Sequence, residues 1–413
     1  MSLKKLYPWI VVGLLWLVGL LNYLDRQMLA TMRPAMQSSI PRLQSAESFG
    51  YLMGIFLWIY GFMSPVAGLI ADRFNKKWLI VGSLFVWSGV TFAMGYATSY
   101  DQLYWLRAIM GISEALYLPT ALALIADFHG NKTRSLAIGI HMTGLYVGTA
   151  LGGFGATLAA AHSWQLTFHS FGIAGIVYAL VLMVFLKGKN EATEPDATGS
   201  FTKPDTSVRK SLRVLFSSLF FWIILIYFAI SSLPSWATKN WLPTLFAQNL
   251  HMPMSKAGPM ATITISVSQF LGVIGGGILS DRWVRKNIRG RIYTSAIGLT
   301  LMIPALLFLG FGYTIFDFLA AGFCFGIGFG MFDANNMPIL CQFVSSRHRA
   351  SAYGIMNMLG VYFGAFITDS LGKITDEGNL GKGFASLAIV VALAVVLQLV
   401  FLRPKQNDFR EVT

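Results

Sequence analysis

Charged residues are scarce in this chain. Asp, Glu, Lys and Arg make up 12% of its 413 residues, whereas apolar residues make up 55%. Average soluble domains have about 25% charged residues. The few charges gather in short clusters, and the apolar stretches between them are long enough to cross a bilayer as helices of about 20 residues. The composition therefore excludes an ordinary soluble domain and predicts an all-α membrane protein.

Residues that carry enzyme or metal chemistry are also few. The chain has two cysteines, Cys324 and Cys341, and no group of Cys and His at metal-ligand spacing. No P-loop string occurs, and the Gly-x-Gly-x-Gly of residues 326–330 lies inside an apolar run rather than after a strand. The short loops leave no room for a catalytic domain. We therefore expect no enzyme activity, no cofactor and no metal. A non-transporting receptor built on the same bundle is an alternative.

Twelve apolar stretches have the length of a membrane span. They cover residues 8–32, 50–71, 78–98, 103–126, 136–160, 165–187, 214–236, 258–280, 292–312, 315–340, 350–371 and 383–402. One long polar stretch with Pro and Ser separates the first six from the last six. We therefore predict an N-terminal six-helix half at 1–187, a linker at 188–213, a C-terminal six-helix half at 214–403 and a tail at 404–413.

The basic residues predict the orientation. In the predicted topology most of the 31 Lys and Arg residues fall on one side, together with both termini and the linker. By the positive-inside rule that side is the cytoplasm, which predicts a multi-pass protein of a cytoplasmic membrane with both ends inside. The net charge of +13 is spread over many short loops, so we expect no nucleic-acid partner.

A short string near the end of one apolar run is repeated in the second half of the chain. Residues 68–77 read GLIADRFNKK, and residues 277–286 read GILSDRWVRK. A second repeat relates Glu114 and Pro119 to Asp333 and Pro338, with the same five-residue spacing in each pair. The two halves are therefore pseudo-symmetric, and membrane bundles of this kind with a site between the halves are typical of transporters.

The repeated Gly-x-x-x-Asp-Arg-x-x-basic-basic string resembles the signature of the major facilitator superfamily. Asn75 departs from it, because the signature usually has Gly at that place. Two further patterns resemble the anion:cation symporter family: Asn22-Tyr23-Leu24-Asp25-Arg26 in the first span, and Arg107, Glu114, Ala115, Pro119, Arg134, Gly139, Gly144 and Gly148 in and after the fourth. Spinster-type lipid transporters share parts of both patterns and are the nearest competitor.

This resemblance implies a fold and a function. The fold is the major facilitator fold, in which two six-helix halves rock about a central cavity. The function is secondary active symport of a small organic anion with protons by a monomer surrounded by lipid. The expected cargo is a sugar acid, namely a hexuronate, an aldonate or a short uronate-bearing saccharide. The alternatives are Na⁺ in place of protons and a Spinster-like lipid cargo.

We single out five ionisable residues inside predicted spans: Asp25, Arg26, Arg107, Glu114 and Asp333. A charge at the bilayer centre costs about 2.5–3.5 kcal/mol on insertion scales, so each of these residues is a functional candidate. Arg107 and Glu114 are seven residues apart, and Asn22 and Arg26 are four apart, so each pair shares one helix face. A structural ion pair between these helices is the alternative.

The residue types suggest separate roles for these charges. Arginine binds carboxylates through two parallel hydrogen bonds, which suits an anion site. We therefore predict that Arg26 and Arg107 bind the anion, or in part neutralise the nearby carboxylates. The resemblance also implies the complementary role for Asp25 and Glu114, which we expect to carry the coupled proton.

Polar and aromatic residues at similar depth are further candidates for substrate contact. They are Tyr23, Asn22, Tyr60, Tyr117, Asn335, Asn336, Asn357, His141 and Gln269. For most of them a packing role is the alternative, and for His141 we favour a hydrogen-bonded core position. Tyr60 and Asn336 are the preferred contacts, Tyr60 because similar family members have a tyrosine there.

The repeated strings predict a gate. The resemblance implies that Asp72, Arg73, Asp281 and Arg282 form a cytoplasmic latch between the halves, with simple positive-inside anchoring as the alternative. Glycines at close-packing spacing, Gly144, Gly148, Gly152, Gly153, Gly360 and Gly364, predict sliding at the interface between the halves.

Overall fold

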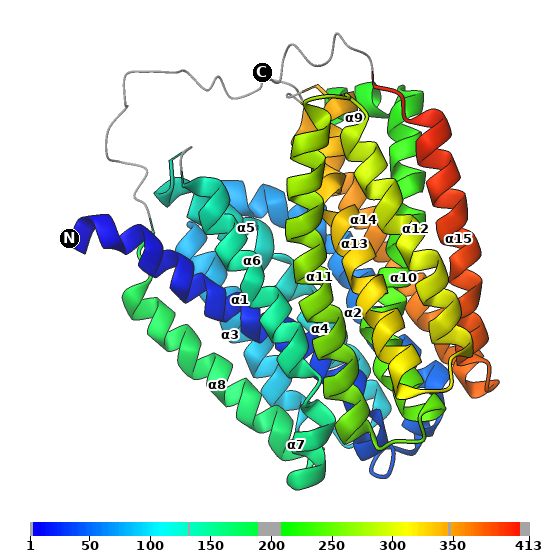
Figure 1. Ribbon diagram of the computed structural model, residues 1–413. Helices are drawn as coiled ribbons and strands as arrows, with labels where there is room; N and C mark the ends of the chain where they lie inside the picture. The colour runs from blue at the N-terminus through cyan, green and yellow to red at the C-terminus, as the bar shows by residue number, and fades with distance from the viewer. Residues whose placement is uncertain (1–2, 131–132, 189–207, 346–347, 405–413) are drawn as a thin grey trace.

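The computed structural model describes residues 3–130, 133–188, 208–345 and 348–404, and most of them are helical (Figure 1). The helices are α1 (Leu3–Met36), η1 (Pro41–Gln44), α2 (Ala46–Arg73), α3 (Lys76–Met94), α4 (Tyr100–Ala115), α5 (Tyr117–Phe128), α6 (Arg134–Gly152), α7 (Gly155–Ala161), α8 (Trp164–Phe185), α9 (Val208–Phe216), α10 (Leu219–Asn249), α11 (Met254–Val284), α12 (Gly290–Phe311), α13 (Ile315–Phe343), α14 (Arg349–Asp376) and α15 (Leu380–Phe401).

The membrane spans agree with the predicted all-α architecture. Ten helical stretches in the described residues are long and apolar enough to span a bilayer, with α4 and α5 together forming one of them. An eleventh is the pair α6 and α7, bent by 42° at the break between them. Helix α14 is more polar and, at 28 residues, lies beside α2 in the same bundle. These elements match the twelve predicted spans in order.

Several helices extend beyond their predicted spans. The seventh span was predicted to end at residue 236, but α10 continues to Asn249. Helix α9 begins inside the predicted linker. The rest of that linker, residues 189–207, and most of the tail, residues 405–413, lie outside the described residues.

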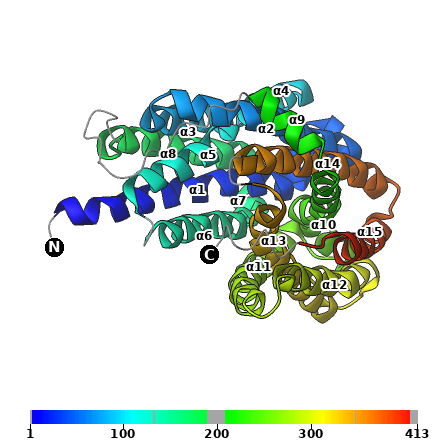
Figure 2. The same cartoon turned by 90° about the horizontal axis from the view of Figure 1, so that it is seen from above.

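The helices form two groups that meet along a narrow interface (Figures 1 and 2). We call α1 to α8 the N-half and α9 to α15 the C-half. The main contacts between them are α2 with α14 and α6 and α7 with α11. We call the end where α8 stops and α9 starts the linker end, and the opposite end, where α1 passes to α2, the far end.

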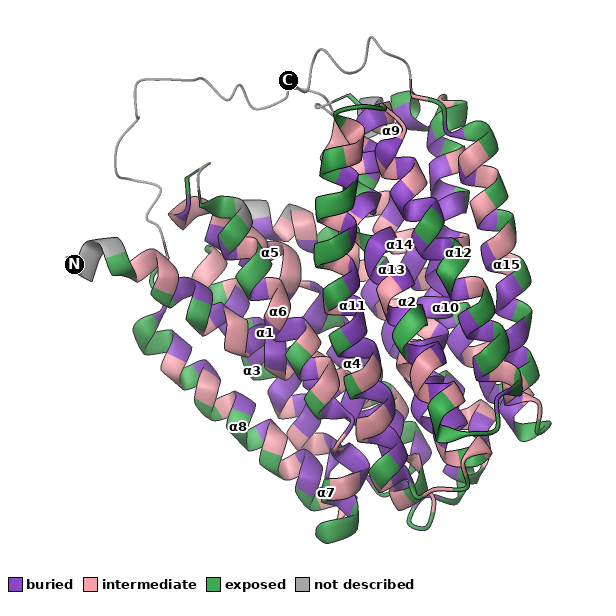
Figure 3. Cartoon of the chain, viewed as in Figure 1, coloured by how far each residue is buried: buried purple, intermediate pink, exposed green. Residues whose placement is uncertain are grey.

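The outer faces of the bundle are apolar. Buried residues lie between the helices, while exposed residues lie on the outside of helices such as α8 and α15 (Figure 3). The exposed residues there include Leu166, Ile173, Val177, Leu180 and Val184 on α8 and Ile389, Leu393, Val396 and Val400 on α15. A contiguous apolar exterior of this kind fits a hydrocarbon environment and not water.

Asn75, where the signature usually has Gly, is the N-cap of α3. Its side-chain oxygen accepts a hydrogen bond from Lys77 N at 3.0 Å. Its φ is −63°, outside the left-handed region that favours glycine, so an asparagine fits here without strain. The departure from the signature therefore leaves the turn intact.

Glycines allow the two halves to approach closely at the far end. A Cβ on Gly153 would lie 2.0 Å from Thr262 Oγ1 and 2.8 Å from Gly258 O, and one on Gly50 would lie 3.0 Å from Thr368 O. The predicted interface role holds for Gly153 but is wrong for the other glycines. Gly144, Gly148 and Gly152 pack against α1, and Gly360 and Gly364 pack against α10, each within its own half.

Hydrogen bonds between the halves also gather towards the far end. The Asp376 carboxylate accepts from Ser45 Oγ at 2.7 Å, Ala46 N at 2.7 Å and Glu47 N at 2.9 Å, so it caps the start of α2 from the other half. Thr157 Oγ1 donates to Ser255 O at 2.7 Å in the same region. Towards the linker end, α1 and α8 lean away from α11 and α15 (Figure 1). This conformation is therefore closed at the far end.

Candidate functional site

Arg26 and Glu114 form an ion pair between α1 and α4. Arg26 Nε donates to Glu114 Oε2 at 2.5 Å, and the Glu114 side chain is completely buried. Three aromatic rings surround the guanidinium, with Cζ-to-centroid distances of 5.0 Å for Tyr23, 4.8 Å for Phe56 and 4.7 Å for Tyr60. These cation–π contacts stabilise the charge in a largely apolar setting.

A second carboxylate and a second arginine lie near this pair. Asp25 is 6% exposed and accepts a hydrogen bond from Thr91 Oγ1 at 3.2 Å. Arg107 is 3% exposed; it donates to Met110 Sδ at 3.2 Å, and its Cζ lies 4.5 Å from the Phe56 ring centroid. Phe56 therefore contacts both guanidiniums. Together Asp25, Arg26, Arg107 and Glu114 form a buried charged cluster in which two positive and two negative groups balance.

The charged cluster has unused hydrogen-bonding capacity. Among the described residues, Asn22 Nδ2, Arg107 Nε and Glu114 Oε1 are buried with no protein hydrogen-bond partner. An unsatisfied buried polar atom costs about 1–3 kcal/mol. Such atoms persist at functional sites, where a ligand, a proton or a conformational change can satisfy them.

A cavity of about 190 Å³ lies between the halves, next to the charged cluster. Its walls come from α1, α5, α6, α10, α11, α13 and α14. The residues that line it are Tyr23, Leu118, Met142, Leu145, Tyr146, Thr149, Phe228, Ser232, Ser235, Trp236, Lys239, Gln269, Phe329, Phe332, Asp333, Tyr353, Asn357, Gly360 and Val361. Tyr23 belongs to both places, because it lines the cavity and its ring contacts the Arg26 guanidinium.

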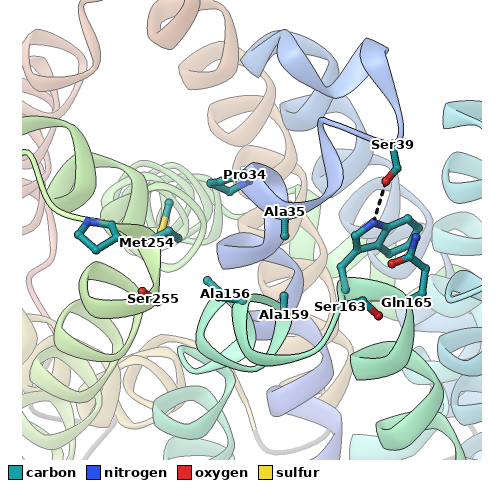
Figure 4. A pocket seen from close by; sticks show the side chains of 12 residues that line it. Pro34, Ala35, Ser39, Ala156, Ala159, Ser163, Gln165, Met254 and Ser255 are labelled. Carbon is teal, nitrogen blue, oxygen red and sulfur yellow. Dashed lines mark hydrogen bonds between the residues drawn. The ribbon is translucent and has the colours of Figure 1, made fainter.

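A larger pocket, of about 500 Å³, lies at the surface of the far end, lined by none of the residues that line the central cavity (Figure 4). Small and hydroxyl side chains from both halves line it, including Pro34, Ala156 and Ser255. All of its lining residues are uncharged. A site for an anion needs a cation or an array of donors, so the smaller central cavity is the better candidate.

Comparison with known families agrees with this architecture. Residues 15–369 match the model of the Major Facilitator Superfamily. The chain belongs to this superfamily. Its members are transporters, so the protein is a transporter and not an enzyme, as the sequence predicted.

Named relatives of similar length align with nearly the whole of this chain. The hexuronate transporter of Bacillus subtilis strain 168 is 25% identical, over 92% of this chain and 93% of its own. The D-galactonate transporter of Escherichia coli O6:H1 is 27% identical, over 94% and 92%. A 4-hydroxybenzoate transporter of Pseudomonas putida is 28% identical, over 94% and 90%. The predicted likeness to sugar-acid transporters is confirmed.

A solved structure has the same fold. A bacterial homolog of the human lysosomal transporter Spinster, in an inward-facing and unoccupied conformation, superposes with a TM-score of 0.81. It is 19% identical and covers 97% of this chain and 98% of its own. The major facilitator fold is therefore confirmed, and the Spinster-type transporters are close neighbours in structure.

The predicted contact residues divide into two groups. Tyr23, Gln269 and Asn357 line the central cavity. Asn336 is not a lining residue, but its Nδ2 donates at 3.4 Å to Oδ1 of Asp333, a charged candidate that does line the cavity. The remaining candidates lie in the packed interior and not among the lining residues. They are Asn22, Tyr60, Tyr117, His141 and Asn335, all at most 7% exposed.

Two of these interior residues have clear packing roles. The Tyr117 hydroxyl donates to Leu15 O at 2.8 Å, and the Asn335 side-chain amide donates to Met331 O at 2.8 Å. His141 is fully buried and packs edge-on against Tyr117, with centroids 6.0 Å apart. His141 therefore has the favoured core position, but its ring nitrogens form no hydrogen bond within the described residues.

The residues of the predicted gate lie at the linker end. Arg73 and Arg282 are exposed, and Asp281 pairs with Arg291 of the same half at 3.8 Å. The side chain of Asp72 lies outside the described residues. In this conformation the ion pair between Asp281 and Arg291 lies within the C-half and does not join the two halves.

The sequence reading missed two ionisable residues inside the bundle. Lys239 lines the cavity, but the predicted span ended three residues before it. Asp369 lies inside the predicted span 350–371 and accepts from Trp58 Nε1 of the N-half at 3.2 Å. Lys239 was missed because the prolines of α10 suggested that the span ended before it. Asp369 was detectable in the sequence, since it is a charged residue within an apolar run.

Proposed function

We propose that this facilitator is a proton-coupled symporter that carries a small organic anion across a cytoplasmic membrane. The observation that carries the proposal is the buried Arg26–Glu114 pair beside the central cavity. Tyr23 connects the two, since it contacts the guanidinium and lines the cavity.

The ion pair gives a route for coupling. When the carboxylate of a substrate draws Arg26 towards the cavity, Glu114 loses its counter-ion in a buried site. An unpaired buried charge is expensive, and taking up a proton removes it. Anion binding and proton binding therefore favour each other, as reciprocal linkage requires.

Asp25 is the second proposed proton carrier. Thr91 Oγ1 lies 3.2 Å from Asp25 Oδ2 and 3.0 Å from Trp87 O. A hydroxyl has a single proton to donate. Thr91 therefore cannot donate fully to both oxygens, whereas a proton on Asp25 would let Asp25 donate to Thr91 while Thr91 donates to Trp87 O.

The transport cycle follows from the contacts between the halves. The far end closes through glycine contacts and the Asp376 cap of α2. Rocking of the halves breaks these contacts and brings the linker ends together, where Asp72, Arg73, Asp281 and Arg282 act as the opposing latch. We place the linker end and both termini in the cytoplasm, because most basic residues lie there.

A sugar acid is the substrate class that we favour. Gln269, Asn357, Ser232 and Ser235 bring amide and hydroxyl groups to the cavity wall. These groups suit the hydroxyls of a hexuronate, an aldonate or a short uronate-bearing saccharide. The relatives named for hexuronate and D-galactonate support this choice.

An aromatic carboxylate is the second candidate. Seven aromatic side chains line the cavity, namely Tyr23, Tyr146, Phe228, Trp236, Phe329, Phe332 and Tyr353. Aromatic rings offer offset or edge-to-face stacking to a benzene ring. The relative named for 4-hydroxybenzoate also points to this class.

Uptake into proteoliposomes tests the proposal. Radiolabelled D-glucuronate, D-galactonate and 4-hydroxybenzoate are offered with an inward proton gradient, an inward Na⁺ gradient or no gradient, and protein-free liposomes are the blank. We expect accumulation of at least one sugar acid that requires the proton gradient. Accumulation driven by Na⁺ alone contradicts proton coupling. Failure of all three acids under every gradient, with flipping of a labelled lysophospholipid, contradicts the substrate class and favours a lipid cargo.

A further inference from the structure

Lys239 carries an ammonium group inside a membrane-spanning helix. It lies on α10 and lines the central cavity. Its Nζ lies 4.9 Å from the Trp236 ring centroid and 5.9 Å from that of Phe329. None of the ion pairs between described residues includes it at 4.0 Å or less. A lysine kept at this depth marks a functional site, because its insertion is costly.

The position of Lys239 in the C-half corresponds to that of Arg26 in the N-half. Glu114 precedes Pro119 by five residues on α4 and α5, and Asp333 precedes Pro338 by five residues on α13. Glu114 pairs with Arg26 of the first membrane helix of the N-half, and Asp333 lines the same cavity as Lys239 of the first membrane helix of the C-half. The N-half pair is closed and buried, whereas Lys239 and Asp333 both line the cavity. The cation of the C-half is therefore the accessible one.

A proline in α10 leaves the backbone carbonyl of Lys239 free to accept a hydrogen bond from the N-half. Pro243 has no N–H, so the carbonyl of Lys239, four residues earlier in α10, has no intrahelical donor. Gln27 Nε2 of α1 fills that position and donates to Lys239 O at 2.8 Å. Gln27 is the neighbour of Arg26 in the chain. This hydrogen bond joins the backbone at Lys239 to the helix that carries the Arg26–Glu114 pair.

We propose that Lys239 holds the carboxylate of the transported anion and that Asp333 is its counter-ion when the cavity is empty. This inference rests on the proposed function and adds a specificity-determining pair to it. The bound carboxylate becomes the close partner of the ammonium, flanked by Trp236 and Phe329. Asp333 then faces a second negative charge in a confined space, and a proton on Asp333 removes the repulsion.

The other charged and titratable groups around Asp333 do not replace this role. Those that line the cavity or adjoin it are Lys239 on α10, Tyr23 and the paired Arg26 on α1, Tyr146 on α6 and Tyr353 on α14. The tyrosines are neutral near pH 7, and Arg26 is paired with Glu114 while the cavity is empty. Anion binding at Lys239 is therefore expected to draw a proton onto Asp333 in addition to the proton proposed for Glu114.

Binding measurements on the purified full-length protein test the pair. Calorimetry with D-glucuronate and with 4-hydroxybenzoate is run on the wild type, Lys239→Gln, Lys239→Arg and Lys256→Gln. Lys256 is an exposed lysine at the far end of α11 and serves as the matched control. We expect Lys239→Gln to weaken binding at least tenfold, Lys239→Arg to retain most of the affinity, and Lys256→Gln to match the wild type.

Proton uptake on binding, compared between the wild type and Asp333→Asn, is a measurement that a purely structural role for the pair would not change. Heats measured in buffers of different ionisation enthalpy give the number of protons taken up on binding, and we expect about one fewer in Asp333→Asn. Wild-type affinity in Lys239→Gln, or unchanged proton uptake in Asp333→Asn, overturns the inference while transport by the wild type stands. If the wild type neither binds nor transports either acid, the proposed function fails and this inference fails with it. Melting temperatures identify any variant that is misfolded. The double variant Lys239→Gln/Asp333→Asn removes both charges together, so that neither charge is left without the other.

Discussion

Arg26 and Glu114, 88 residues apart in the chain, share a hydrogen-bonded ion pair of 2.5 Å inside the bundle. Glu114 is completely buried, and the Arg26 side chain is 14% exposed, so the pair has little contact with water. A buried pair is not in itself stabilising relative to apolar residues, but breaking it on one side is costly. A substrate carboxylate or a proton can therefore change whether the two side chains are paired.

The cost of an unpaired charge gives the first prediction. Arg26→Met leaves Glu114 buried without its counter-ion, and we expect the free energy of unfolding to fall by about 3–5 kcal/mol. Arg26→Met/Glu114→Gln removes both charges and should regain most of that loss. Thermal melting in detergent at pH 7 measures both. A double variant no more stable than the single one contradicts the pairing.

The proton-coupling groups give the second prediction. Glu114→Gln and Asp25→Asn keep the shape of the side chains but cannot exchange a proton. We expect each to abolish uptake against a gradient while exchange of labelled for unlabelled substrate continues. Counterflow and pH-driven uptake in the same proteoliposomes separate the two activities. Persistent accumulation in both variants rejects these carriers.

The cap of α2 gives the third prediction. Asp376 accepts three hydrogen bonds from residues 45–47 of the N-half, two of them from backbone N–H groups at a helix start. Asp376→Ala leaves these donors without their acceptor, and loss of a cap costs about 0.5–2 kcal/mol. We expect the population closed at the far end to decrease by a factor of a few.

Spin labels on the far ends of α2 and α14 measure this population through their distance distribution. Asp101→Ala is the control, since Asp101 forms an exposed ion pair with Arg42 at the same end. Exposed pairs contribute about 0–1 kcal/mol, and this one joins residues of a single half. An equal shift in both variants would mean that the cap does not control the opening.

Close contact at Gly153 gives the fourth prediction. A Cβ there would lie 2.0 Å from Thr262 Oγ1, whereas a Cβ on Gly139, in the helix α6 that Gly153 caps, would meet no atom within 4 Å. Gly153→Ala should therefore hinder closure of the far end and slow transport several-fold. Gly139→Ala should leave the rate unchanged, and equal rates in the two variants contradict the packing.

Much of the fold was predictable because its signals are local. Long apolar runs, the repeated GLIADRFNKK string and the clustered basic residues predicted the spans, their order and the two halves. Helix ends were less predictable. Lys239 is a polar residue between Pro234 and Pro243, and both features favour a loop in sequence terms. Tertiary packing in the bundle, including the Gln27 bond to the Lys239 carbonyl, continues the helix through them.

The candidate site was predicted only in part because facing directions depend on packing. Arg107 and Glu114 share a helix face, as the spacing required, but that face meets Phe56 and Arg26 rather than the cavity. Tyr117 has the residue type of a ligand contact, yet its hydroxyl is used by Leu15 O. No pattern within one helix shows which neighbouring backbone group will satisfy such a side chain.

The most direct test of proton-coupled symport is the movement of protons with the substrate. Proteoliposomes that contain a trapped pH-sensitive dye receive external D-glucuronate at equal internal and external pH. Our account predicts that the lumen becomes acidic in step with glucuronate entry, and that Glu114→Gln abolishes this signal while glucuronate exchange persists. Entry of glucuronate without any acidification of the lumen would contradict it.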